Sequence, residues 1–577
     1  MSLTSALQIG HSALTASQVG LQVAGNNLAN AATPGYTRQI ASLAPQAGQR
    51  FGNVFLGRGV GVQDVRRQID EALQSRLRNG ISDAAASRQQ LDVYSAIEAT
   101  LNELSDGDLS SQLSEFFNGW SELANLTQGS AVVVQTGVSL AAFMRSMRSD
   151  LTSLRGQVDD QIGAMVTRAD ELTRQIASLN SQIVSSELGA SENGALRDQR
   201  DAALSSLAEL MDISTVRQGD GSVDVLVGST PIVLGSSAKG MTLERVSEGG
   251  SLQLRLLAGV DERELTLTSG SIGALLGQRD SAITSTVQHL DSLAAQLIHE
   301  INRVHSVGAT AEGQTSAIGH RAVGVSDAVL ALNDPANGAF ADLPFGATNG
   351  GFYVHVRHAT TGDEQIVRID IDLDGLNASG LAGTEDDTSL NDIVASLDGV
   401  EGLNASLTPD GRLNIQAAEG FSFNFADDSS GVLAVLGVNA YFTGTSASDI
   451  AVDPSLVAEP SQLKSGRITD GTFVANGTAL ALADLQDHAV GSLNGRSLRQ
   501  FWQDRVQSLA VETEAAAGRA ASAGLVEQSL QTQRAALSGV SIDEESLNLL
   551  NFQRQYQGAA RLISIADELM QTLMSLV

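Results

Sequence analysis

The chain has 577 residues, of which 42% are hydrophobic and only 4% aromatic, and its formal net charge is −31 at pH 7. This length is too great for one hydrophobic core, so several domains are expected, and the apolar content is too high for a disordered polymer. The acidity excludes the basic face on which nucleic-acid binding depends, and it opposes binding to anionic membranes. The absence of cysteine excludes disulfides, thiolate catalysis and cysteine metal sites.

The first predicted element is a helix in which leucine recurs every seven residues. The four leucines of this seam are Leu7, Leu14, Leu21 and Leu28. The interleaved positions are mostly small, as at Gly10, Ser17 and Ala24. A helix with this pattern can be approached closely by another helix, so a coiled-coil partner is expected.

The heptads end in the stretch NNLANAATPGYTRQ at 26–39. Pro34 disfavours helix at the residue before it and Gly35 permits a left-handed turn, so the helix is predicted to stop here. The predicted hinge comprises Asn26, Asn27, Asn30, Thr33, Pro34, Gly35 and Tyr36. An ordinary capped helix end is one interpretation, but it needs a single asparagine. Three asparagines indicate bridges to backbone groups of this subunit or of a neighbour.

Long helices and two β segments are predicted between the ends of the chain. Helical apolar stripes run through approximate ranges 63–105, 138–186, 283–304 and 497–537. Residues 214–270 alternate between short apolar runs and turns, which predicts a small antiparallel β unit. Residues 311–490 predict a larger inserted β domain, in which the sequence PDG at 409–411 predicts a hairpin turn.

The last predicted helix starts near Ser541 and Glu544, which have the spacing of a capping box. Its apolar residues recur in steps of three and four, and they include Leu549, Phe552, Tyr556, Ile563, Met570 and Leu573. Neither terminal helix can bury its stripe alone. Packing on the protein's own body is one solution. We predict instead that the two stripes pair with each other and with copies from neighbouring subunits, which makes these residues and the four leucines the assembly interface.

The predicted fold class is therefore mixed α and β and multidomain, with terminal coiled-coil helices, a long helical-bundle stem and inserted antiparallel β domains. The terminal coiled-coil domain comprises 1–40 and 540–577. The helical stem comprises 41–213, 271–310 and 491–539, the small β unit 214–270, and the outer β-rich domain 311–490.

Candidate chemistry is weak throughout the chain. The segment DIDLDG at 370–375 imitates the start of a calcium-binding loop, but the position that requires a glutamate is Leu381. The segment HEINRVH at 299–305 imitates a zinc-protease helix, but Arg303 stands where the second histidine is required, and a polar helix face is the expected interpretation. We therefore expect no metal site, cofactor or catalytic residue. A hydrolase site within 311–490 is the least favoured alternative.

Both ends of the chain resemble a known family. NNLANAATPGYTRQ and, at 539–573, GVSIDEESLNLLNFQRQYQGAARLISIADELMQTL are similar to the terminal signatures of the flagellar rod, hook and hook-associated axial proteins. Internal stretches at 59–79, 193–213, 290–308 and 433–454 resemble the hook-associated members at the junction of hook and filament. The resemblance is weakest at about 311–430.

The resemblance implies a structural role, an adaptor ring that joins hook to filament. The terminal coils would line an inner tube, with the stem around them and the β domains facing outward. The implied partners are further copies of this chain in a ring, the hook protein, the next hook-associated protein, and an export chaperone at the C-terminal helix. Neither nucleic acid nor membrane insertion is expected.

The implied localisation is extracellular, at the hook–filament junction, after type III export. The first residues, MSLTSALQIGHSALTASQ, lack the basic and apolar regions of a cleaved secretory signal, which agrees with this route. Two alternatives stay open: another flagellar axial protein of hook or rod type, and a secreted coiled-coil adhesin or scaffold.

Overall fold

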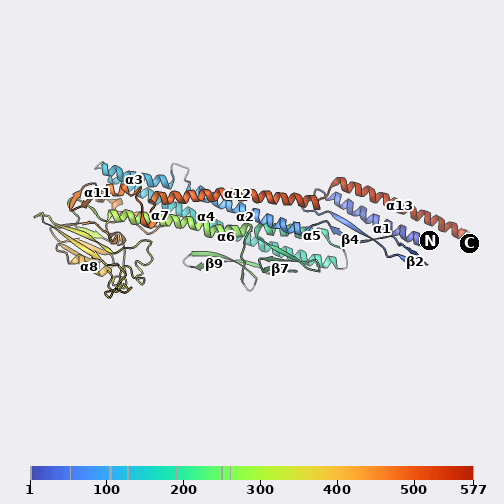
Figure 1. Ribbon diagram of the computed structural model, residues 1–577, viewed down its shortest axis with the longest axis horizontal. Coiled ribbons are helices and arrows are strands. Elements are labelled where there is room, and N and C mark those ends of the chain that lie inside the picture. The colour runs from blue at the N-terminus through green and yellow to red at the C-terminus, as the bar shows by residue number, and fades with distance from the viewer. Residues whose placement is uncertain are drawn as a thin grey trace. The chain divides into compact units, whose positions relative to one another are not determined.

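A computed structural model describes residues 3–51, 54–102, 107–125, 129–188, 191–248, 251–259 and 262–575. Long helices and small antiparallel sheets make up the fold, which confirms the predicted mixture of α and β (Figure 1). The chain divides into two compact units, each assembled from separate stretches of sequence. The finer four-part division stays a prediction. No helix among the described residues is long and apolar enough to cross a membrane.

The first unit comprises 1–93, 157–280 and 514–577. Its own helices are α1 (Leu3–Ala29), α5 (Gly194–Leu210), α6 (Gly270–Gln278) and α13 (Ile542–Ser575). The long helices α2 (Glu71–Leu101), α4 (Ser130–Glu187) and α12 (Leu498–Ser538) contribute residues to both units. A π-helical turn, η1 (Arg279–Ile283), follows α6.

The helix predicted from about residue 63 begins later than expected. Residues 60–67 instead form β4 (Val60–Arg67), which pairs antiparallel with β1 (Gln39–Pro45). A second short pair, β2 (Gln49–Phe51) and β3 (Val54–Leu56), lies between these strands in the sequence. Helix α2 starts at Glu71 because the Asp70 carboxylate accepts a hydrogen bond from the Leu73 amide at 3.0 Å, which satisfies one of the free donors of the first turn.

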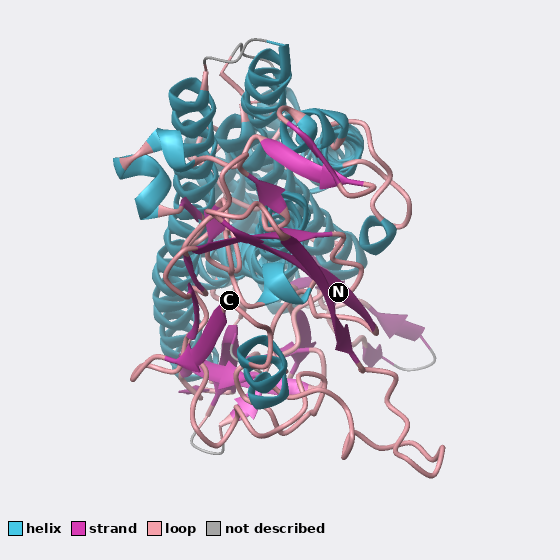
Figure 2. Ribbon diagram, turned by 90° about the vertical axis from the view of Figure 1, so that its left-hand side faces the viewer, coloured by secondary structure: helices cyan, strands magenta, loops and turns pink. Residues whose placement is uncertain are grey.

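The strands predicted within 214–270 are confirmed, and they form two small antiparallel sheets. Figure 2 shows the strands of the fold in magenta. The first contains β5 (Ser214–Arg217), β6 (Val223–Val227), β7 (Thr230–Leu234) and β8 (Ser237–Ala238), in that order. The second contains β9 (Met241–Glu248), β10 (Ser251–Ala258) and β11 (Arg263–Glu264), with β10 in the middle. In β6, Val223, Val225 and Val227 are buried and alternate with less buried residues, the pattern of a strand with one covered face.

The second unit comprises 94–156 and 281–513. Its own helices are α3 (Leu109–Asn125), α7 (Thr284–His305), α8 (Leu390–Asp398), α9 (Val432–Val435), α10 (Pro454–Ala458) and α11 (Gly477–Asp484), with short 3-10 turns η2 (Pro460–Gln462) and η3 (Gly491–Leu493). The predicted stripe of α7 is confirmed, since Leu290, Leu297 and Ile301 are fully buried.

The strands of the second unit form four small antiparallel sheets among the described residues. One sheet places β14 (Gly350–His358) between β15 (Glu364–Ile371) and β18 (Phe421–Ala426), and a second places β17 (Leu413–Ala417) between β13 (Ser316–Ile318) and β16 (Leu403–Leu407). The others comprise β12 (Gly308–Ala309), β21 (Gly466–Thr469) and β22 (Thr472–Val474), and the pair β19 (Phe442–Thr443) and β20 (Ala451–Val452).

The predicted hairpin turn at 409–411 is confirmed between β16 and β17. Gly411 has φ +82°, and a Cβ at this position would lie 2.0 Å from the Val323 carbonyl oxygen. Only glycine fits such a site, because the backbone conformation and the neighbouring chain both exclude a side chain.

Several of the chain's few aromatic rings meet around Tyr441 in the second unit. The ring of Tyr441 lies 5.3 Å from that of Trp120 and 4.7 Å from that of Phe442, and its hydroxyl donates to the Val133 carbonyl at 2.7 Å. His305 joins this cluster and is fully buried, so the expectation that it lies on a polar helix face is wrong. The partners of His305 come from segments distant in sequence that pack on α7, and sequence periodicity cannot reveal such contacts.

His305 should make the chain sensitive to acid. Its Nδ1 donates to the Asn439 carbonyl at 2.7 Å, and burial lowers its pKa from 6.5 to about 4. Between about pH 4 and pH 6.5 the folded chain therefore binds fewer protons than the unfolded chain. The contribution of neutral His305 to the free energy of unfolding is complete above pH 6.5, and at most about 3 kcal/mol of it is lost as pH falls towards 4.

Thermal unfolding of wild type and His305→Gln, measured across this pH range, checks the expectation. The wild-type melting temperature should fall more steeply than that of the variant. Parallel curves would contradict it.

Candidate functional site

Helices α1 and α13 of the first unit lie side by side, close to the two ends of the chain (Figure 1). The buried residues of α1 are mostly small: Gly10, Ala16, Ser17, Gly20, Ala24 and Asn27. A Cβ at Gly10 would lie 2.7 Å from Cγ1 of Ile563, and a Cβ at Gly20 would lie 2.5 Å from Cε1 of Phe552. The small residues therefore permit a helix contact closer than any larger side chain would allow.

The structure places the predicted seam residues in different environments. The leucines Leu7, Leu14, Leu21 and Leu28 are half-buried beside the closest contact rather than within it. In α13, Phe552 and Ile563 contact the glycines of α1, and Leu549 and Met570 are half-buried. Tyr556 and Leu573 are exposed. Most of the predicted α13 seam thus already has cover within the chain.

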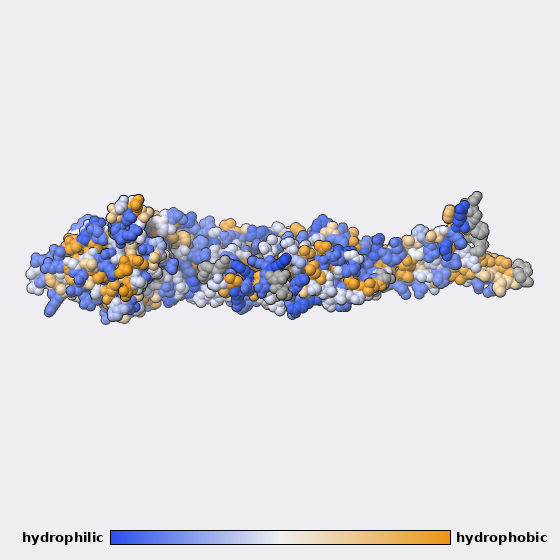
Figure 3. Space-filling view, turned by 90° about the horizontal axis from the view of Figure 1, so that it is seen from below, coloured by the Kyte–Doolittle hydropathy of each residue, from blue (hydrophilic) through white to orange (hydrophobic). Residues whose placement is uncertain are grey.

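A second apolar face of α13 has no cover within the described chain. It comprises the exposed residues Leu547, Leu550, Leu562, Ile565 and Leu569, here called the outer stripe. Ile565 lies two residues after Ile563, a step that turns the direction of a side chain by about 200° around a helix. The outer stripe therefore faces away from α1. Figure 3 shows hydrophobic residues gathered beside the C-terminal end, where Leu3, Met570, Leu573 and Met574 line an open apolar hollow.

The predicted hinge ends α1 through local hydrogen bonds. Asn30 Nδ2 donates to the carbonyl and the side-chain oxygen of Asn26, each at 3.0 Å, and Thr33 Oγ1 donates to Asn30 Oδ1 at 3.3 Å. Gly35 adopts φ +80°, the left-handed conformation expected from the sequence. Pro34 is exposed.

Asn27 has a different role from the other two asparagines. It is 1% exposed, and its amide bonds both backbone groups of Gln39, since Nδ2 donates to the carbonyl at 2.9 Å and Oδ1 accepts from the amide at 3.0 Å. The hydroxyl of Tyr36 donates to the same Oδ1 at 2.8 Å. Asn27 Nδ2 also donates to Glu545 Oε2 at 3.1 Å. This side chain therefore joins α1, β1 and α13.

Glu545 is the buried anion at this junction, with 2% of its surface exposed. Arg38 forms an ion pair with it at 2.7 Å and a second with Glu544 at 2.9 Å. The Arg38 amide donates to the last carbonyl of α12, that of Ser538, at 2.9 Å. Burial, together with the charges of Asp198 and Glu545, raises the pKa of Tyr36 to about 12 and keeps its hydroxyl a donor.

The predicted capping box is half present. The Glu544 amide donates to Ser541 Oγ at 3.5 Å, but the Glu544 carboxylate bonds Arg38. Arg38, which is distant in sequence, therefore binds the Glu544 carboxylate in place of the Ser541 backbone amide that a capping box would use.

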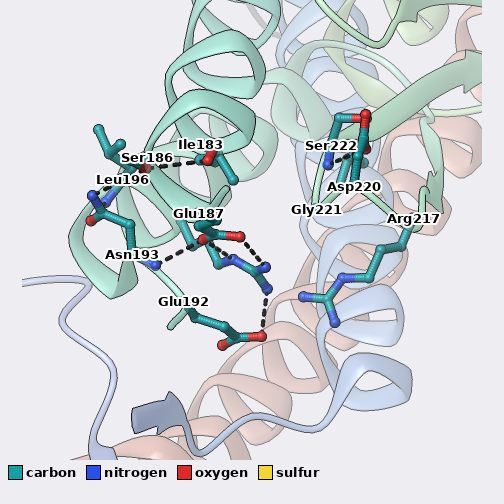
Figure 4. A network of polar contacts seen from close by, with 12 residues as sticks. Ile183, Ser186, Glu187, Glu192, Asn193, Leu196, Arg217, Asp220, Gly221 and Ser222 are labelled. Carbon is teal, nitrogen blue, oxygen red and sulfur yellow. Dashed lines mark hydrogen bonds and ion pairs between the residues drawn. The ribbon is translucent and has the colours of Figure 1, made fainter. Parts of the chain in front are cut away.

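A second charged network continues from the hinge. The Thr37 amide donates to Asp198 Oδ2 at 3.1 Å, and Arg67 pairs with both Asp198 and Asp201 at 2.7 Å. Figure 4 shows Glu187 and Glu192 bonded to the guanidinium between them, which is that of Arg197, at 2.7 Å each. This network links the hinge to α5 and to the end of α4.

None of these charged residues belongs to the predicted site. The segment RDQRD at 197–201 places four charged residues within five positions, a signal that could have pointed to buried ion pairs. Arg200 is almost fully buried and donates to Asn180 Oδ1 at 3.0 Å and to the Gly221 carbonyl at 2.8 Å. Burial lowers its pKa to about 10.

Among the described residues, one group of three carboxylates could approach a metal ion: Asp372, Asp374 and Asp387. Asp387 Oδ2 already accepts from Asn333 Nδ2 at 2.6 Å and from the Gly375 amide at 3.2 Å. These bonds give the cluster an ordinary loop-stabilising role.

Comparison with known proteins agrees with the terminal signatures. Family models match residues 94–318 (flagellar hook-associated protein FlgK helical domain), 531–576 (flagellar basal body rod FlgEFG protein C-terminal) and 7–37 (flagella basal body rod protein).

Curated relatives are similar along the chain. Flagellar hook-associated protein 1 of Escherichia coli K12 is 26% identical, and that of Salmonella typhimurium LT2 is 25% identical, each over 100% of both chains. The Bacillus subtilis protein of the same name is 29% identical over 53% of this chain and 68% of its own. Among solved structures, the flagellar hook junction protein FlgK of Burkholderia pseudomallei matches with TM-score 0.46 and 16% identity, covering 80% of this chain and 99% of its own.

Two glycines of α1 provide a matched test of the close contact. Gly20→Ala places a methyl against the Phe552 ring and should destabilise the α1–α13 pair by about 1–3 kcal/mol. Gly25→Ala meets no atom within 4 Å and should stabilise the helix by up to about 1 kcal/mol. Hydrogen exchange of α1 and α13 amides measures both effects. Equal stabilisation by the two changes would refute the contact.

Removal of the buried carboxylate should loosen the same pair. Glu545→Ala leaves Arg38 and Asn27 without their shared acceptor and should cost about 3 kcal/mol, or roughly hundredfold faster exchange of α1 and α13 amides. Asp543→Ala, in the same first turn but exposed, should cost less than about 1 kcal/mol. If both variants exchange like wild type, Glu545 does not hold the junction.

Proposed function

We propose that this chain, which belongs to the flagellar hook-associated protein 1 family, is a structural subunit of the bacterial flagellum that joins hook to filament. Similarity over the full length of curated family members supports this role, and so do the axial-protein signatures at both ends. Self-assembly into an axial structure agrees with those terminal signatures. We infer a mechanical rather than a catalytic role.

The observation that carries the proposal is the outer stripe of α13. Helix α1 covers one face of α13 and leaves five large hydrophobic residues exposed on the opposite side, with Ile565 48% and Leu569 52% exposed. The stripe consists of two groups, Leu547 with Leu550, and Leu562 with Ile565 and Leu569, and exposed apolar groups on one helix face mark an interaction site. We assign the outer stripe to the α13 contact with a neighbouring copy in a ring. Leu573, four residues after Leu569, extends the predicted interface at the edge of the stripe, whereas Tyr556 lies on the α13 face that carries Ile563.

This assignment refines the predicted interface. Phe552 and Ile563 pack against Gly20 and Gly10 inside the subunit. Phe552 and Ile563 therefore orient α13 on α1 but do not contact a neighbouring copy. The half-buried leucines of α1 and the hinge would then contribute indirectly, because they fix how α13 is presented. Burial of the outer stripe must overcome repulsion between chains that each carry a net charge of −31, which delays association of free copies.

The finer partners follow from family membership. One side of the ring would contact the hook protein and the other the next hook-associated protein. The exposed outer stripe would need a cover during export, which suits a chaperone bound at α13. We place the assembled protein outside the cell, after type III export, with no contact to nucleic acid and no membrane insertion.

Complementation of cells that lack this chain tests the proposal. In the deletion strain, electron microscopy should show complete hooks without filaments, and flagellin should be lost to the medium. Wild type and Ser564→Asp should restore filaments, whereas Ile565→Asp should not, because it would bury an unpaired carboxylate in the interface. Both positions are exposed in the chain, so neither change should unfold it.

The amount of each variant in the medium separates failed assembly from failed export. Secreted Ile565→Asp with bare hooks supports the outer stripe. Normal filaments with Ile565→Asp would reject the stripe, and truncated or absent hooks in the deletion strain would move the protein to a hook or rod position.

A further inference from the structure

The second unit contains a cavity of about 540 Å³ that the assembly role does not use. Its walls come from 305–320, 439–440 and 453–464. Several lining residues, including Thr315, Ser316 and Gln462, are exposed, so the cavity is open to solvent. Its volume lies within the range of small-molecule sites, about 300–1,000 Å³.

Lys464 lines this cavity and is one of two lysines in the entire chain, the other being Lys239. The Lys464 amide donates to His305 Nε2 at 3.4 Å, which fixes the backbone at the cavity wall. No carboxylate in the described part of the chain forms an ion pair with its Nζ. Burial lowers the pKa of Lys464 to about 8. An ammonium in this position lacks the counter-ion that would offset its desolvation.

The carboxylate of Asp453 lies in the same cavity, but both of its oxygens already have hydrogen-bond partners. Its Oδ2 bonds His320 Nε2 at 2.5 Å, and its Oδ1 accepts from the amide and hydroxyl of Ser455, each at 2.8 Å. Burial acts to raise the pKa of Asp453, but these hydrogen bonds outweigh burial and lower it. Asp453 therefore stays an anion and repels further negative charge at its side of the cavity.

The remaining polar groups of the cavity include a second unused donor. The Gln314 Nε2 is buried, and no hydrogen-bond partner for it is present among the described residues. His305 offers no free acceptor, because Nδ1 bonds the Asn439 carbonyl and Nε2 accepts from the Lys464 amide. Within the part of the chain that the structure describes, the cavity thus presents one unpaired cation and one unpaired amide donor.

We propose that this cavity binds a small monocarboxylate, whose oxygens pair with Lys464 Nζ and accept a hydrogen bond from Gln314 Nε2. A carboxylate supplies the missing single negative charge and two acceptor atoms. A doubly charged phosphate fits less well, because the fixed anion of Asp453 shares the cavity.

Amine labelling tests the proposal on the full chain, with peptides identified by mass spectrometry. Sodium acetate is the probe, and sodium chloride at matched ionic strength is the control. Near pH 8, acetate should slow labelling of Lys464 about fivefold, because a rise of about one unit from its pKa of about 8 lowers the fraction of free amine from about one half to about one tenth. Lys239, which is exposed, should label at an unchanged rate and serves as the internal reference.

Two variants separate binding from a general salt effect. Acetate should raise the melting temperature of wild type but not of Lys464→Met, which removes the buried charge and should still fold. Gln314→Leu keeps the amine and should weaken the protection by acetate. Labelling of Lys464 that acetate leaves unchanged would overturn the proposal, as would protection by phosphate without protection by acetate.

Discussion

The close contact of α1 with α13 is the constraint on which the terminal structure depends. Gly10 and Gly20 leave no room for a Cβ, so Ile563 and Phe552 of α13 seat directly against the backbone of α1. This contact decides which face of α13 is consumed within the subunit. The outer stripe is left exposed as a consequence, and the proposed assembly role rests on that exposure.

Buried polar groups fix the geometry that the small residues permit. Asn27, Arg38 and Glu545 tie the end of α1, the first residues of β1 and the start of α13 into one junction. Asp198 extends the junction to Arg67 and α5 through the Thr37 amide. Buried ion pairs add little net stability compared with apolar packing, but they penalise any arrangement in which one partner is left alone. For a subunit that must present α13 in one direction, such specificity matters more than stability.

In the second unit, aromatic packing rather than buried ion pairs surrounds the central polar side chain. An aromatic cluster around Tyr441 anchors α3 and α7, and neutral His305 is held between that cluster and the backbone of Asn439. Lys464 departs from this pattern, because its half-buried side chain lines an open cavity and no carboxylate among the described residues pairs with its ammonium. A group that costs stability and contacts solvent through a cavity is better explained by a ligand than by packing.

The sequence by itself determined the type of its most strongly periodic elements, because periods of two and about 3.6 residues follow from local geometry. The four central helices, the hairpin at 409–411 and the end of α1 at the Asn-Pro-Gly stretch could be read in this way. Only the tertiary structure decided which residues meet. Periodicity identifies an apolar stripe but not its partner, and α13 is apolar on two faces, so the small seam of α1 had to select one. The pairing of β1 with β4, the diversion of Glu544 to Arg38 and the burial of His305 and Lys464 all depend on contacts between residues distant in sequence, which no local pattern specifies.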